Sequence, residues 1–272
     1  MNEFPSRPSG LPWNWTFPPH GETFGFSPNI SGAHLARSMM WTELQILLRY
    51  LPPSAGPLDY KTAIVDENLL SKTTQSSRLK TFRHLFSLYL LDPKYTLFRV
   101  FRQLNQSQPD PNCQMALVLA FCRDPQLRDS FRLIEALTPG ELFPRPRMDL
   151  YWETLYPNRF KPTMKASLSQ HVNTSWTVSG HLQGRTKKYR SHPTPTLAGA
   201  TFSLFAGYLS GLRGNILLSS VFGRLVGGDP NQLLSLLRGA SQRGWCRVRN
   251  AGGMMEIDFS ALLTPQEQEL LP

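Results

Sequence analysis

The chain has 272 residues, of which 40% are hydrophobic and 11% aromatic, enough to fill a core. This composition excludes wholesale disorder and a small disulfide-stabilised fold. The formal net charge is +10, and its excess is concentrated: residues 154–228 hold nine basic residues and no acidic one, against 16 and 14 in residues 1–153 and 4 and 5 in residues 229–272. The imbalance favours a polyanionic partner, nucleic acid before membrane.

Cysteine usage and the N-terminus indicate a reduced compartment. The three cysteines form no even set and no CxxC pair, so neither a disulfide framework nor a thiolate zinc site is expected. The first 21 residues lack a basic segment followed by an apolar run, so no signal peptide is predicted and the cytoplasm is the expected location. Residues 191–212 carry no charge, but their prolines, glycines and hydroxyl groups favour a buried helix over a membrane span.

The first half of the chain predicts helices behind a flexible tail. Residues 1–32 are rich in Pro and Gly and form the expected tail, with Trp13, Trp15 and Phe17 available to dock on the body. Apolar residues three and four apart then predict helices over 33–51, 59–70, 75–91, 95–104, 112–122 and 126–137. Asp59 is the expected N-cap of the second helix. The 112–122 helix is apolar on every side, which places it at the centre of the core.

The second half follows a Pro-rich linker over 138–147. Its expected elements are a segment at 148–156 and helices at 162–170, 173–183, 196–211, 216–225 and 230–243. Two alternating runs about Gly252-Gly253 predict a terminal β-hairpin. The expected fold is mainly α, with two helical subdomains (33–145 and 146–272) of helix-turn-helix or winged-helix character and a small C-terminal hairpin.

No residue pattern typical of catalysis or cofactor binding occurs. The six histidines form no pair at metal-ligand spacing with a carboxylate, and GHLQGRTKKY lacks the Lys-Ser/Thr ending of a phosphate-binding loop. Residues 154–228 offer no Asp or Glu as a general base, and Cys122 and Cys246 are expected to be small core residues. We therefore expect a non-enzyme without metal, cofactor or small-molecule substrate.

Residues 162–184 predict helix, turn and helix, with the second helix beginning at Asn173 or Thr174. The side chains expected in or near a DNA groove are short or polar ones: Thr174, Ser175, Thr177 and His181. Short side chains let a helix enter the major groove, where hydroxyl groups contact phosphates or base edges. Trp176 and Val178 are expected to face inward.

A basic segment follows this helix and two lysines precede its neighbour. The residues expected on phosphates are Arg185, Lys187, Lys188 and Arg190, together with Lys161 and Lys165. If roughly four phosphates are neutralised, log affinity should fall with log salt at a slope of about −3.6. The alternative is a solvated basic loop between core helices.

Two further segments are weaker candidates. Residues 59–91 again predict helix, turn and helix, with Arg78, Lys80 and Arg83 as a secondary DNA contact or, alternatively, a solvated face. The aromatic residues Phe82, Phe86, Phe98 and Phe101 are expected in the core. Arg247 and Arg249 leave one face of the terminal hairpin, which is either a wing on phosphate or an exposed strand edge kept soluble by charge.

Three stretches resemble BrxA, a small component of BREX bacteriophage-exclusion systems. They are IVDENLLSKTTQSSRLKTFRHLFSLYL (64–90), MALVLAFCRDPQLRDSF (115–131) and, more loosely, HVNTSWTVSGHLQG (171–184), within a likeness over about 34–225. The resemblance implies a mainly helical, non-catalytic accessory protein that binds double-stranded DNA in a defence and methylation complex. The chain differs in its Pro-rich tail, its terminal hairpin and Thr174–Trp176, where the family has a charged Thr-Arg start. The resemblance therefore supports phosphate contacts more than base contacts.

The sequence thus predicts a sequence-tolerant duplex-DNA-binding protein acting through residues 154–190, in company with other components of a phage-defence complex. Two alternatives remain open. One is a scaffold whose basic face docks an acidic protein, and the other is an RNA-binding helical module. No membrane partner is expected.

Overall fold

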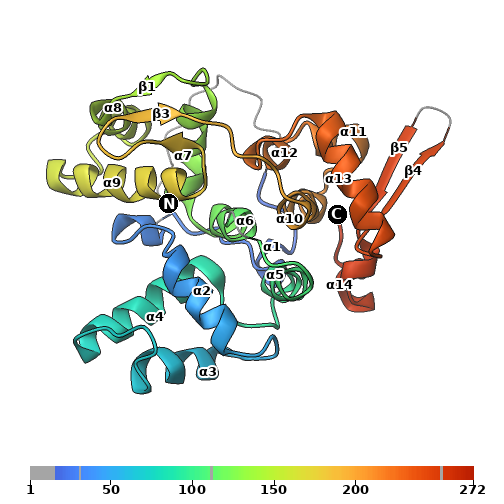
Figure 1. The fold of residues 1–272 in the computed structure, drawn as a ribbon, viewed down its shortest axis with the longest axis horizontal. Helices are drawn as coiled ribbons and strands as arrows, with labels where there is room; N and C mark the ends of the chain where they lie inside the picture. Colours follow the sequence, from blue (N-terminus) through green and yellow to red (C-terminus); the bar gives the residue numbers. More distant parts are fainter. Residues whose placement is uncertain (1–15, 31, 111–112, 252–253) are drawn as a thin grey trace.

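Two apolar helices lie at the centre of the fold, α6 (Gln114–Arg123) and α10 (Leu197–Leu209) (Figure 1). The computed structural model describes residues 16–30, 32–110, 113–251 and 254–272. The two helices pack against each other, and nearly every side chain on both is buried. Gly199 allows the close approach, because a Cβ there would lie 2.3 Å from Gln114 Oε1. The central position expected for the 112–122 helix is confirmed.

The described part of the expected tail packs on this core instead of standing free. It contains the one-turn helix α1 (Gly21–Phe24), and the rings of Phe24 and Phe26 are buried. Arg123 Nη1 donates to the Gly25 carbonyl at 2.7 Å, which fixes the segment beside α6. Phe17 stays 38% exposed, while Trp13 and Trp15 lie outside the described residues.

The N-terminal helix-turn-helix is present. It lies in the expected segment 59–91 and comprises α3 (Pro57–Lys61), the π-helical turn η2 (Thr62–Asp66) and α4 (Gln75–Tyr89). The single helix expected over 33–51 is divided into η1 (Ala33–Leu35) and α2 (Trp41–Tyr50), with Met40 between them at a left-handed φ of 51°. Thr74 caps α4 by accepting from the Ser77 amide at 3.1 Å. The expected role of Asp59 as an N-cap is wrong: the cap is Gly56, whose amide donates to the Asp59 carboxylate at 2.8 Å.

Two more amphipathic helices complete the core, α5 (Thr96–Ser107) and α7 (Pro125–Glu135). Phe98 and Phe101 on α5 are buried and stack with centroids 6.1 Å apart. Phe82 and Phe86 on α4 are half-buried against the same cluster. All four aromatic residues are therefore part of the core, as the spacing predicts.

A three-stranded antiparallel sheet was not expected from the sequence. Its strands are β1 (Leu142–Phe143), β2 (Leu182–Gln183) and β3 (Lys188–Arg190), in the order β1-β3-β2. Together with α7, α8 (Arg145–Leu155) and α9 (Pro162–Val178), they give the succession α–β–α–α–β–β, which is the element order of a winged helix-turn-helix. We call α7 to β3 the winged unit. Strands of two or three residues are too short to produce a visible alternation.

The two helices expected over 162–184 are one. α9 runs unbroken for 17 residues, from Pro162 to Val178, and the chain turns away just beyond it at Gly180, which has a left-handed φ of 79°. Thr174 does not cap a new helix, because its hydroxyl donates to the Gln170 carbonyl one turn back at 2.8 Å. The helix-turn-helix of the winged unit is therefore α8 and α9, joined by residues 156–161.

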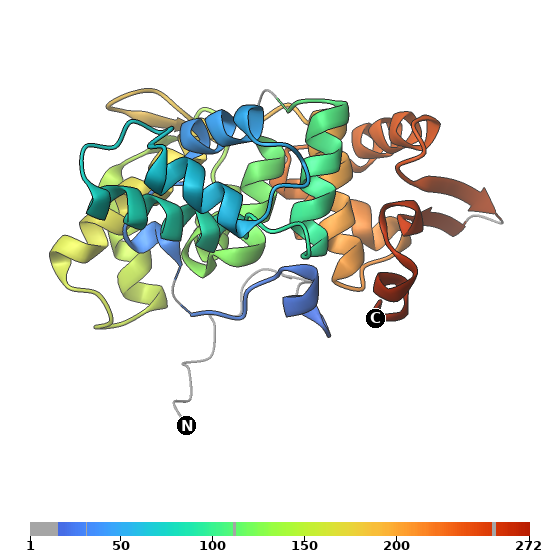
Figure 2. The ribbon, with the colours of Figure 1, turned by 90° about the horizontal axis from the view of Figure 1, so that it is seen from below.

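The C-terminal part ends in a projecting hairpin (Figures 1 and 2). Its elements are α11 (Gly214–Leu218), α12 (Val221–Leu225), α13 (Pro230–Gln242), β4 (Arg247–Ala251), β5 (Met254–Asp258), η3 (Ser260–Leu262) and α14 (Pro265–Glu269). The predicted hairpin is confirmed, with residues 252–253 outside the described part. An ion pair between Arg99 and Glu267 ties α14 to α5.

One continuous hydrophobic cluster includes residues from both expected subdomains. α6 belongs to the first and α10 to the second, and residues of both helices are part of this cluster. The division at residue 145 stays a prediction. In the described residues, no helix is both long enough and apolar enough to span a membrane.

Candidate nucleic-acid interface

Helix α9 presents a polar stripe to solvent. The exposed side chains Thr163, Ser167, Gln170 and Thr174 are spaced four, three and four residues apart and so share one face. The opposite face is buried through Leu168, Val172 and Trp176, also one turn apart. Seventeen residues make a helix about 25 Å long, which exceeds the width of a DNA major groove.

The loop between β2 and β3 carries exposed cations. Gly184 begins it with a φ of 100°, and a Cβ there would lie 2.1 Å from the Lys187 carbonyl oxygen, so the turn requires glycine. Lys188 Nζ donates to the Gly184 carbonyl at 2.6 Å and closes the loop. Arg185 and Lys187 at its tip point their charges into solvent. We call residues 184–188 the wing loop.

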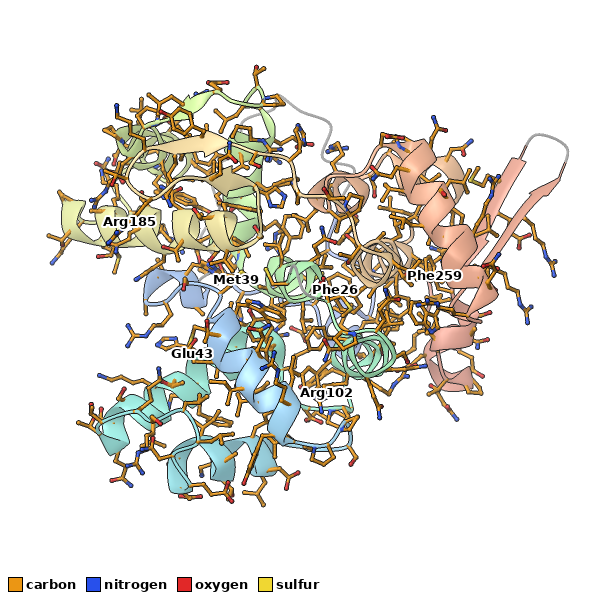
Figure 3. The ribbon with its side chains drawn as sticks, viewed as in Figure 1. Phe26, Met39, Glu43, Arg102, Arg185 and Phe259 are labelled. Carbon is orange, nitrogen blue, oxygen red and sulfur yellow. The ribbon has the colours of Figure 1, made fainter. Side chains whose placement is uncertain are left out.

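A pocket of about 270 Å³ lies between α9 and the wing loop. Gln170 and Thr174 of α9 line it, together with Arg185 and Lys188 of the wing loop and Arg145 from the start of α8. Figure 3 labels Arg185 beside α9, at the end of the protein away from the terminal hairpin. Three cations from two separate segments of the sequence therefore converge beside the polar stripe.

Arg145 was missed by sequence reasoning. It lies in the Pro-rich segment that was interpreted only as a linker, nine residues before the acid-free stretch begins. The arginines flanking Pro146 were the available signal. Lys161, in contrast, was predicted, and it is exposed at the N-cap of α9.

Two predicted groove residues are buried and do not belong to this surface. Ser175 is fully buried; its Oγ accepts from the Met39 amide at 2.9 Å and donates to the His171 carbonyl at 3.1 Å. His181 is 1% exposed, and its ring packs edge-on against Trp176 with centroids 4.9 Å apart. The expected groove contacts from these two residues are therefore corrected.

His181 is also held uncharged. Its Nε2 donates to the Leu225 carbonyl at 3.0 Å, which joins the winged unit to α12. Burial, with a smaller contribution from the neighbouring Arg190 charge, lowers the pKa of His181 to about 3. The ring is a neutral packing element at physiological pH.

Arg190 is 5% exposed and is likewise removed from the expected phosphate contacts. Its Nη1 donates to the His181 carbonyl at 3.1 Å, and burial lowers the pKa of its guanidinium. Strand register separates Arg190 from the exposed Tyr189 before it: Arg190 lies opposite Leu182 in the sheet, and both of these side chains are buried. The alternation of a strand decides this, not the basic character of the sequence.

Three other cations of the acid-free stretch are engaged within the protein, two by acids from outside the stretch and one by an aromatic ring. Lys165 pairs with Glu153 on α8, and Arg224 pairs with Glu135 on α7. Arg213 stacks over the Tyr208 ring at 3.9 Å and donates to the Tyr208 carbonyl at 2.6 Å. An acid-free stretch of sequence is therefore not an acid-free surface.

The secondary candidate on α4 is reduced to two exposed cations. Arg78 Nη1 donates to the Val65 carbonyl at 3.1 Å, which engages it within the N-terminal helix-turn-helix. Lys80 and Arg83 remain exposed.

Thr177 of α9, also predicted as a groove residue, is half-buried and donates to the Asn173 carbonyl at 2.7 Å.

The thiols are placed for packing. Cys113, Cys122 and Cys246 are all buried and unbridged, and burial raises the pKa of Cys122 and of Cys246 to about 12. Across the described ranges, no three His, Cys, Asp or Glu residues gather in a group that could hold a metal ion.

Comparison with known proteins adds no assignment: no protein-family model matches the chain, and no curated protein matches it.

Proposed function

We propose that the protein binds duplex DNA through α9 and the wing loop, a surface whose own contacts depend little on the base sequence. The observation that carries this proposal is the convergence of Arg145, Arg185 and Lys188 on one pocket beside the exposed stripe of α9. In this arrangement α9 enters the major groove while the cations beside it contact the flanking phosphates. Lys187 adds a charge at the tip of the wing loop, and Lys161 is proposed as a separate phosphate contact at the N-terminal end of α9.

The polar side chains of α9 favour sequence-tolerant binding. The hydroxyls of Ser167 and Thr174 donate to carbonyls of their own helix, at 3.1 Å and 2.8 Å. Their hydrogens are therefore already engaged and discriminate poorly between bases. Phosphate contact, which depends on charge, then supplies most of the affinity.

The cellular role that we propose is that of a non-catalytic cytoplasmic accessory protein of a BREX-type phage-defence system. Its support is the sequence resemblance over 64–90 and 115–131, segments that fall on η2, α4, α6 and α7. Other components of the defence complex would be its protein partners. The buried thiols, with their raised pKa values, offer no activated nucleophile.

The test is a paired charge reversal. Because Arg185 and Lys187 are exposed and pair with no acid in the described part of the chain, Arg185→Glu with Lys187→Glu should leave the fold intact. We expect duplex affinity to fall by more than about tenfold at fixed salt, since two phosphate contacts become repulsions. The matched control is Arg49→Glu with Lys61→Glu, an equal charge change on exposed side chains of α2 and α3.

Gel-shift titration, with circular dichroism to verify folding, measures both variants. Equal affinity of the wing-loop variant and the wild type would overturn the proposed surface. Two further measurements separate the rival functions. A scaffold would keep its partner after nuclease treatment, and an RNA-binding module would prefer structured RNA to duplex DNA of equal length, because A-form RNA closes the groove to a helix.

A further inference from the structure

The C-terminal part repeats the helix-then-hairpin arrangement of the winged unit. α13 is followed directly by the hairpin β4–β5, as α9 is followed by β2–β3. α11 begins against this hairpin, because a Cβ on Gly214, its first residue, would lie 2.9 Å from the Met255 carbonyl oxygen. α11 and α13 both pack on the hairpin, and α13 packs on α10. Figure 1 shows the two helix–hairpin pairs at opposite ends of the protein.

The exposed face of α13 differs chemically from that of α9. Asn231, Ser235, Arg238 and Gln242 are exposed and spaced four, three and four residues apart, opposite the buried Leu233 and Leu237. These are the residue types that hydrogen-bond to base edges: Arg to guanine, Asn and Gln to adenine, and Ser to several bases. In the described part of the chain, none of the four side chains makes a hydrogen bond or an ion pair.

The helix is held rigidly beneath this face. Asp229 caps it by accepting from the Asn231 and Gln232 amides at 2.8 Å and 3.0 Å. At its other end Trp245 is buried, and Cys246 Sγ donates to the Leu237 carbonyl at 3.4 Å. The four exposed side chains therefore project from a fixed backbone, which selective recognition requires.

Charge distinguishes this end from the wing loop. Arg247 and Arg249 are exposed on the hairpin, but in register they lie opposite Asp258 and Glu256. The local charge is nearly balanced, so this end contributes little to phosphate affinity. Uncharged amides and one free guanidinium contribute direction-dependent hydrogen bonds instead.

We infer that α13 reads base edges in the major groove of duplex DNA and gives the protein a sequence preference. The inference rests on the proposed function, and it assigns affinity to α9 and the wing loop and selectivity to α13. The preferred site contains guanine and adenine positions contacted by Arg238 and by the amides of Asn231 and Gln242.

The experiment uses the full chain and a randomised duplex library. Repeated selection with the wild type should enrich one motif, and that duplex should bind more tightly than a scrambled one. Asn231→Ala with Arg238→Ala should reduce this preference by roughly tenfold or more and leave binding to the scrambled duplex unchanged. Arg238→Lys keeps the charge without the bidentate fork and should lose the guanine preference alone.

Gln232→Ala is the matched control, because Gln232 is exposed on α13 but lies about 100° around the helix from the stripe. It should keep the preference. Selection without enrichment, or a preference that survives in the double variant, would overturn the inference and leave the proposed function standing. Absence of binding to any duplex would overturn both.

Discussion

Basic side chains only a few residues apart in the segment 185–190 differ sharply in solvent exposure. Lys187 is exposed at a loop tip, while Arg190, three positions on, lies inside the protein and donates to the His181 carbonyl. His181 in turn contacts Trp176, Phe131 and the Leu225 carbonyl. The interior of the winged unit thus contains two ionisable groups whose charged forms are disfavoured by burial.

His181 should make stability fall in acid. Its folded-state pKa of about 3 lies below the ordinary value of 6.5, so below pH 6.5 the unfolded chain binds a proton that the folded protein does not. Stability is therefore lost as the pH falls from 6.5 towards 3, by about 2 kcal/mol at pH 5. The variant His181→Gln has no titrating ring and should show a shallower pH dependence over this range.

Urea denaturation at several pH values between 7.5 and 5 measures both proteins, and every other titrating group cancels in the difference between them. The quantity to compare is the slope of the unfolding free energy against pH, because the absolute stability of the variant can also change for other reasons. Parallel stability curves for the two proteins would contradict a depressed pKa at His181.

Among the helices, the crossing of α6 and α10 depends on the absence of one side chain. Gly199 lies in the first turn of α10, where Thr196 Oγ1 accepts from its amide and Gln114 Oε1 accepts from the Thr196 amide. A methyl group there would lie 2.3 Å from Gln114 Oε1 and 2.7 Å from Thr196 Oγ1. The glycine is thus required by packing between helices, since its own backbone is ordinary helix.

Two identical substitutions should have opposite effects. Gly199→Ala forces apart α6 and α10 and should destabilise the protein by about 1–3 kcal/mol, the usual cost of overpacking. Gly239→Ala on α13 meets only Leu197 Cδ1 at 3.4 Å and should stabilise it by about 0.5–1 kcal/mol, because alanine favours the helix. Thermal unfolding compares the two, and a loss of stability at position 239 similar to that at 199 would refute the packing argument.

Across the entire protein, long-range pairing reduces the charge available to a ligand. Of the nine cations in residues 154–228, five are engaged within the protein. Lys165 and Arg224 pair with acids and Arg190 is buried, while Arg213 stacks on Tyr208 and Arg159 donates to the Ile30 carbonyl. The proposed interface therefore depends on five cations, one of which comes from outside the stretch. They are Arg145, Lys161, Arg185, Lys187 and Lys188.

The salt dependence of duplex binding should follow this smaller number. Five phosphate contacts predict a slope of log affinity against log salt of about −4.5, whereas nine would give about −8. Lys187→Ala should make the slope less steep by about 1, and Lys61→Ala on α3 should not change it. Titrations of duplex binding at several salt concentrations measure these slopes. If Lys187→Ala and the wild type have the same slope, phosphate contact by Lys187 of the wing loop is excluded.

Local periodicity was sufficient for the helical class, for the burial of α6 and for the terminal hairpin, because each depends on neighbours within a few residues. The core placement of Phe98 and Phe101 belongs to the same group. The continuity of α9 was missed, because a Ser/Thr-rich segment suits a helix start as well as a helix that bonds back to its own carbonyls.

The composition of the candidate interface depended on contacts between distant parts of the chain. β1 joins β3 through Leu142 and Tyr189, 47 positions apart, and this pairing brings Arg145 near the wing loop. Ser175 Oγ accepts from the Met39 amide inside the protein, and Arg224 pairs with Glu135. No pattern within a single helix encodes such partners. Burial and ion pairing over long separations therefore selected which basic residues face solvent, whereas hydrophobic spacing had already determined where the helices form.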